Sequence, residues 1–172
     1  MSLSSGLTID CSSQKCSGGV AKLYLANKDD VDAITYTSGE NSTATAITMV
    51  AAAVFYEFEF ADFTAVFNED APAENCNYAI TQTFDGVYPC HQQSVRDIIQ
   101  QLQDGSCCGF VGIVETLSGK KWLWGDLDKR RIKLLNSPTT TGAAIADQNQ
   151  ATFNFQCQTT KLAVEYSGVV PV

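Results

Sequence analysis

The stretch FVGIVETLSGKKWLWGDLDKRRIKLL, from Phe110 to Leu135, decides the expected fold. An apolar run from Phe110 to Leu117 meets a Ser118-Gly119 turn and returns as the run from Lys121 to Trp124. Two apolar runs joined by a short turn that contains Gly are typical of a β-hairpin, because Gly adopts the positive φ that such turns need. A third segment, from Arg130 to Leu135, is expected to extend this hairpin into a meander.

One helix is expected just before this hairpin, from His91 to Asp104. Its apolar residues recur at the i, i+3, i+4 and i+7 spacing of a single helix face, namely Val95, Ile98, Ile99 and Leu102. The other face is rich in Gln, and Gly105 provides a C-terminal stop. A helix with one apolar stripe is expected to lie across a sheet.

Most of the remaining chain carries strand signals. Apolar and polar residues alternate most clearly in Val20–Ala26, Phe55–Phe60, Cys76–Phe84 and Ala151–Gln158. The expected fold is therefore mainly β, an antiparallel β-sandwich or barrel-like core with one flanking α-helix at about 91–104. We expect a flexible N-terminal arm at 1–19, a single β-rich domain at 20–166 and a C-terminal tail at 167–172.

The charge of the chain argues against a grip on nucleic acid. The formal net charge is −8, and clustered Lys and Arg, which displace counterions from phosphates, are what such a grip needs. An acidic surface also suits a wall past which DNA slides without sticking. No secretory signal opens the sequence and the longest apolar run, 51–56, is too short to cross a bilayer, so we expect a soluble protein made in the cytosol, without a membrane anchor.

Seven cysteines are present, an odd number for a framework of disulfides. Small buried or half-buried thiols are the simplest interpretation. A zinc site is a second one, although Cys11 and Cys16 only border the usual spacing and His91 is the only histidine. Disulfides formed later, outside the cell, are a third.

Three further features suggest surfaces. Glu57 and Glu59 share one face of the FYEFEF strand, as a solvated acidic face or as the lining of an aqueous channel. Trp122 and Trp124 point the same way, either into the core or as a stacking platform for a sugar or a base. Six of the 11 basic residues form a basic segment that suits either contact with an acidic surface, such as that of another copy, or a solvated turn: Lys120, Lys121, Lys129, Arg130, Arg131 and Lys133.

Catalytic signatures are missing from the sequence. It contains no GxSxG, HExxH, phosphate-binding loop or dinucleotide-binding glycine pattern. A triad would need His91 at its centre, and no nucleophile is visible beside it. We expect no enzyme, and we assign no catalytic, cofactor-binding or metal-binding residue.

The order of these features resembles phage major tail tube proteins, especially those of phages that infect Bacteroidetes. The residues that carry the resemblance are Gly18-Gly19 before the first strand, ITYTSG at 34–39, AITM at 46–49, FYEFEF followed by Phe63-Thr64, the striped helix, GKKWLWG at 119–125 and TGAAIADQNQATFNF at 141–155. They extend over most of the chain, from about residue 18 to 157.

The resemblance implies a subunit that forms rings, commonly hexameric, which stack into a hollow tube for DNA ejection. It implies a virion protein assembled in the host cytoplasm, with itself and other tail proteins as partners and with genomic DNA passing without specific binding. Candidate interface residues are Lys129, Arg130, Arg131, Lys133, Ser38, Gly39 and Glu40, and candidate lumen residues are Glu57 and Glu59. The alternatives are another virion structural protein (tail terminator, tail tip or head decoration) and a carbohydrate- or surface-binding β-domain that uses the two tryptophans.

Overall fold

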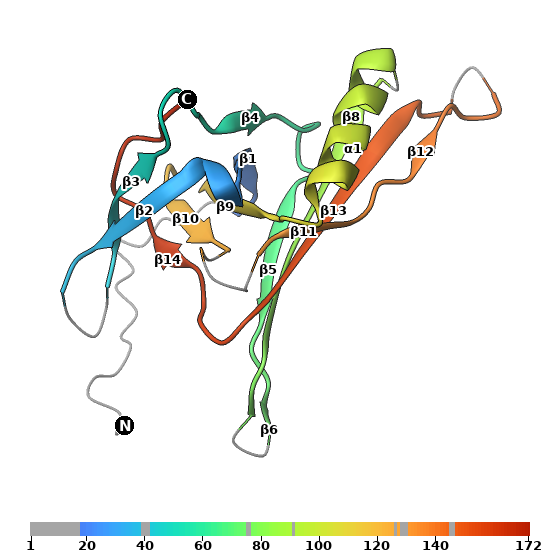
Figure 1. Cartoon of the computed structure of the whole chain (residues 1–172). Helices are drawn as coiled ribbons and strands as arrows, with labels where there is room; N and C mark the ends of the chain where they lie inside the picture. The colour runs from blue at the N-terminus through green and yellow to red at the C-terminus, as the bar shows by residue number, and fades with distance from the viewer. Residues whose placement is uncertain are drawn as a thin grey trace.

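The chain folds mainly into antiparallel strands with one α-helix among the residues that the computed structural model describes, 18–38, 42–74, 77–90, 92–125, 127, 131–144 and 147–172 (Figure 1). This confirms the expected fold class. In chain order, the elements are β1 (Val20–Asn27), β2 (Val31–Tyr36), β3 (Ala44–Met49), β4 (Tyr56–Phe58), β5 (Val66–Asp70), β6 (Ala73–Glu74), β7 (Asn77–Tyr78), β8 (Ile80–Pro89), α1 (Gln93–Gly105), β9 (Phe110–Thr116), β10 (Lys121–Trp124), β11 (Lys133–Asn136), β12 (Thr139–Thr140), β13 (Gln150–Thr159) and β14 (Val164–Glu165).

The predicted hairpin forms the centre of the first sheet, sheet I, whose order is β14-β10-β9-β1-β4. Trp122 lies opposite Val114 and Leu123 opposite Ile113, and Gly119 in the turn has a φ of +81°. The first five residues of β9 are all buried, because side chains cover this sheet on both faces.

The second sheet, sheet II, has the order β11-β13-β8-β5, with β12 pairing the start of β13. Its long strands β8 and β13 pair over their whole length, from Gln150 opposite Pro89 to Thr159 opposite Ile80. Beyond β5 and β8 the chain continues as the short ladder β6–β7, which projects past the body of the molecule (Figure 1). We call β6, β7 and the adjoining ends of β5 and β8 the projecting hairpin.

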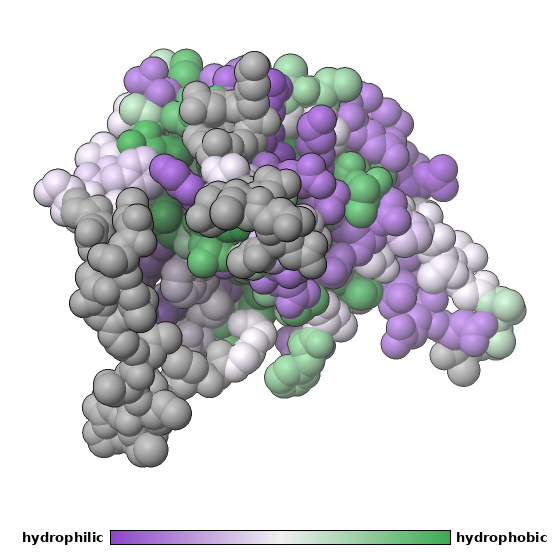
Figure 2. Space-filling view, turned by 90° about the horizontal axis from the view of Figure 1, so that it is seen from below, coloured by the Kyte–Doolittle hydropathy of each residue, from purple (hydrophilic) through white to green (hydrophobic). Residues whose placement is uncertain are grey.

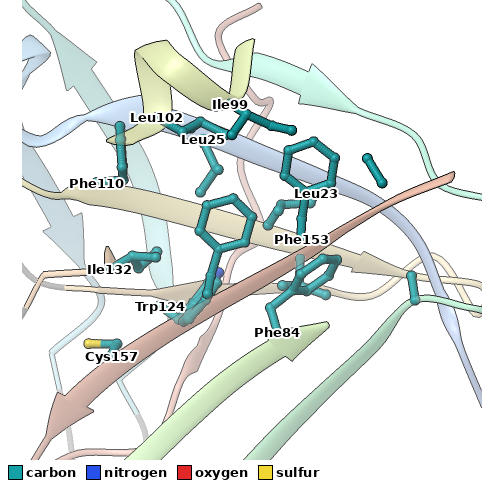
Figure 3. Close-up of a cluster of buried hydrophobic side chains, with 14 of the residues drawn as sticks. Leu23, Leu25, Phe84, Ile99, Leu102, Phe110, Trp124, Ile132, Phe153 and Cys157 are labelled. Atoms are coloured by element: carbon teal, nitrogen blue, oxygen red, sulfur yellow. The ribbon is translucent and has the colours of Figure 1, made fainter. Parts of the chain in front are cut away.

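The main core lies between sheet I, sheet II and α1 (Figure 3). Trp124 of β10 is 1% exposed, and its ring meets that of Phe67 from β5 at a centroid distance of 5.1 Å. Phe84 of β8 and Phe155 of β13 pack beside it, and Val95, Ile99 and Leu102 close the core from the helix. The stripe predicted for the helix is therefore the face that packs, although Ile98 stays 38% exposed.

A second core covers the opposite face of sheet I. The β2–β3 hairpin and the C-terminal segment pack there against Tyr24, Val111 and Leu123. Tyr166 is 3% exposed, and the backbone N–H of Phe55 donates to the carbonyl of Pro171. The expected C-terminal tail thus contributes to the fold.

Two expected strands are wrong in extent or in partner. The strand predicted to run on from Phe55 forms only β4, from Tyr56 to Phe58, because the following residues leave the sheet to place Phe60 against Phe84 of sheet II. The segment predicted to extend the hairpin makes one bridge, Ile132 with Phe110, and then joins β13 in sheet II as β11. His91, expected at the start of the helix, lies outside the described residues.

No helix in the described part of the chain has both the length and the apolar character needed to cross a membrane.

Two buried phenols predict how stability depends on alkaline pH. Burial raises the pKa of Tyr24 and Tyr166, whose hydroxyls donate to a carboxylate oxygen of Glu115 and to the carbonyl of Val169. A raised pKa in the folded state gives stability that is complete below the unfolded value, about 10, and is lost as pH rises through the folded value. We expect the free energy of unfolding in urea to fall above about pH 10, and to fall less in the Tyr24→Phe/Tyr166→Phe double variant. Equal declines in both proteins would contradict this origin.

Candidate assembly surface

One face of sheet II carries the half-buried and exposed side chains, and no described element packs a core against it. Along β8 and β13, buried residues such as Phe84 and Phe155 alternate with half-buried or exposed residues that point away from the core. The outward positions are Val66, Asn68 and Asp70 on β5, Thr81, Thr83, Asp85 and Val87 on β8, Thr152, Asn154, Gln156 and Gln158 on β13, and Lys133 on β11. We call this set the outer face of sheet II.

The outer face of sheet II is polar and carries few charges. Hydroxyl and amide side chains dominate it, with two aspartates and a single lysine at its described positions. Asp85 accepts a hydrogen bond from the side-chain amide of Asn154, directly across the ladder, which satisfies part of the hydrogen-bonding capacity of its carboxylate. Such a face hydrates well and has little to offer a phosphate backbone.

The two edges of sheet II differ in direction and in charge. Each neighbouring pair of strands is antiparallel, so β5 at one edge runs opposite to β11 at the other. No described strand pairs with the free side of β5. At β11 the edge is short and bulged, and the hydroxyl of Ser106 accepts a hydrogen bond from the backbone N–H of Leu134. This edge therefore offers side chains rather than free backbone groups to a neighbour.

Arg131 and Lys133 lie together at the β11 edge. They line a hollow of about 460 Å³ with Leu134, Leu135, Gln156 and Gln158, which we call the basic hollow. The guanidinium of Arg131 donates to the carbonyls of Cys107 and Cys108, at 3.3 and 2.7 Å, and so holds this corner against the end of α1. Lys133 is exposed and makes no ion pair with another described residue.

The other predicted interface residues do not join this hollow. Ser38 is exposed just after β2 and does not line it. Lys129, Arg130, Gly39 and Glu40 lie outside the described residues. The predicted basic segment is thus represented at the hollow by its last two members.

Glu57 and Glu59 occupy a different surface. The ammonium of Lys22 lies 2.5 Å from a carboxylate oxygen of Glu57 and 3.5 Å from one of Glu59, and the hydrogen bond with Glu57 is the main cause that raises the pKa of Lys22. Both glutamates also line an apolar groove of about 530 Å³ between β4 and α1. Their assignment to a channel stays a prediction.

The tryptophan pair is not an exposed platform. Trp124 is buried in the main core, and Trp122, two residues earlier, is half-buried. Stacking of a ligand on both rings would require the core to open. The interpretation of these residues as core holds for Trp124.

The expectation of buried thiols holds for only one described cysteine. Cys157 is buried in the main core, whereas Cys90, Cys107 and Cys108 are exposed. Short loops at both ends of α1 carry these exposed thiols. Within the described ranges, no three His, Cys, Asp or Glu side chains gather in a way that would hold a metal ion; Cys11 and Cys16 fall outside those ranges.

The outer face of sheet II is the surface that sequence reasoning missed as a unit. The alternation in each strand was visible, with Thr81 and Thr83 opposite Ile80 and Phe84. What the sequence does not reveal is that β8 pairs with β13, which brings two polar rows into one face. Seen from below, hydrophilic and intermediate residues, purple to white, are interspersed with separate hydrophobic patches in green (Figure 2).

Comparisons with protein-family models, curated proteins and solved structures found no match to this chain.

Proposed function

We propose that this chain is a structural subunit of a phage tail tube, which assembles with copies of itself into rings that stack into a conduit for DNA ejection. The observation that carries the proposal is sheet II, which combines a polar, cation-poor outer face with two edges of opposite direction. In this proposal the protein is a virion component with a structural role, other tail proteins are its further partners, and DNA passes it without specific binding.

The edges of sheet II support ring formation. When two copies stand side by side, β5 of one and β11 of the next run antiparallel, as strands within each sheet do. A contact between two different edges is heterologous, and repeated heterologous contacts generate closed rings or open filaments. The β5 edge, which no described strand pairs, is also a surface of the kind that proteins normally cover.

The outer face supports a passage for DNA. A ring built from sheet II would present hydroxyl and amide side chains to its interior, with Asp85 hydrogen-bonded to Asn154. DNA binding without sequence preference rests on Lys and Arg near phosphates, and this face holds one lysine at its edge. DNA would therefore move along it without being held.

Light scattering after size exclusion, at rising protein concentration, tests the proposal. We expect the molar mass to rise to multiples of the 18.6 kDa chain, consistent with rings.

A further inference from the structure

The end of β5 gives sheet II an acidic edge. Glu69 and Asp70 are its last two residues. Glu69 already accepts hydrogen bonds from the amide of Gln82 and the N–H of Ala163, both at 2.7 Å, which fixes the base of the hairpin to the segment before β14. Asp70 is exposed and has no ion-pair partner among the described residues.

The opposite edge of the same sheet is basic. One row of paired residues crosses sheet II from edge to edge, in the order Lys133, Gln156, Thr83 and Asn68. Lys133 and Asn68 are therefore the two ends of this row. Asp70 follows Asn68 by two residues and therefore emerges on the same outer face. Each copy thus carries, at opposite ends of one face, an anion and a cation that form no ion pair with any described residue.

The strand ladder leaves room beside the cation. β11 and β12 cover β13 only up to Gln156, so the segment Cys157–Thr159 has no described strand on that side. The basic hollow lies at this step, and Leu135, 64% exposed, adds an apolar contact beside it. The hollow is thus a concave, basic site at one edge, and Asp70 is an exposed acidic residue at the other edge.

We propose that the acidic edge of one copy, the end of β5 with Asp70, seats in the basic hollow of the next copy, with Lys133 as its main counter-charge. This contact rests on the proposed function and specifies how neighbouring subunits join. Opposite charges at the two edges favour the head-to-tail contact. They disfavour β5 against β5 and β11 against β11, because each of those pairs brings like charges together. This arrangement of charges therefore favours rings over closed two-fold dimers.

Charge exchange tests the contact. Asp70→Lys and Lys133→Glu are each expected to raise the concentration of half-assembly about tenfold or more, because each places like charges at every contact. The double variant, with both changes in one chain, and an equimolar mixture of the two single variants are both expected to restore assembly. In the mixture, alternating copies meet as Asp70 with Lys133 and as the exchanged pair. Sedimentation velocity at low salt measures the distribution, and higher salt is expected to weaken the wild-type assembly.

Two controls make the result specific. Asp32→Lys and Arg96→Glu change exposed charges to the same extent away from both edges of sheet II, on β2 and on α1, and should leave assembly unchanged. Circular dichroism should show that all variants keep the wild-type fold. If the wild type assembles and the single variants assemble equally well, or if neither the double variant nor the mixture recovers, this contact is wrong while the proposed function stands. A wild type that never assembles would overturn both.

Discussion

Replacement of Trp124 by alanine is expected to lower the free energy of unfolding by about 3–5 kcal/mol, the range for large aromatic residues removed from a core. Trp124 is 1% exposed, and its ring bridges the sheets, since it stands on β10 of sheet I and packs edge-on against Phe67 of sheet II. The cavity would lie where the two layers meet, so neither layer alone can collapse to fill it. Urea unfolding followed by far-ultraviolet circular dichroism measures the loss. A domain of this kind has about 5–15 kcal/mol in total, so this loss removes a large fraction of its stability and should lower the urea midpoint clearly.

Trp122→Ala is the matched control for this core prediction. It removes the same side chain from the same strand, but from a half-buried position, and should cost clearly less. Equal losses for the two variants would mean that Trp124 is not the residue that joins the sheets. The remaining tryptophan in each variant also provides a fluorescence signal for the transition.

Lysines placed on the outer face of sheet II are expected to make assemblies hold DNA. In the Thr83→Lys/Thr152→Lys variant, each subunit adds two cations at outward positions of β8 and β13. A ring that brings about six to ten lysines to phosphates would lose about 10³- to 10⁵-fold in affinity between 50 and 200 mM salt. Short duplex DNA should therefore sediment with the variant assemblies at low salt and be released at higher salt, whereas wild-type assemblies should leave it in solution.

A control variant with two added lysines on the helix distinguishes the effect of their location from the effect of net charge. Gln100→Lys/Gln103→Lys adds them at exposed positions of α1. Weak retention by this control, alongside strong retention by the sheet variant, would place the DNA against sheet II. Equal retention by both, or none by the sheet variant, would contradict the assignment of this face to the passage.

Periodicity in the sequence was sufficient for the local elements. The β9–β10 hairpin, the stripe of α1 and the alternation around Phe153 and Phe155 are each set by neighbours a few residues away. The structure confirms all three. Such patterns report which face of an element is apolar, and every face they marked is packed at least in part.

Long-range pairing is what the sequence could not supply. Nothing in the residues before Leu135 indicates that β11 leaves the hairpin for β13, because either partner satisfies the same backbone groups. The strand after Phe55 ends at Phe58, and Phe60 packs instead on Phe84 of sheet II, a contact distant in sequence that the local alternation does not reveal. The sequence likewise singles out Lys133 as a member of a basic segment but does not connect it with Asp70. Only the order of sheet II places these two residues at opposite edges of one face.

Self-assembly of the unmodified chain tests the central claim most directly. Light scattering after size exclusion, with negative-stain microscopy of the same fractions at rising concentration, measures both mass and shape. The account predicts rings or stacked tubes with a central hole, in growing proportion as the concentration rises. A chain that stays monomeric at every concentration, with no hollow particles in the images, would contradict it.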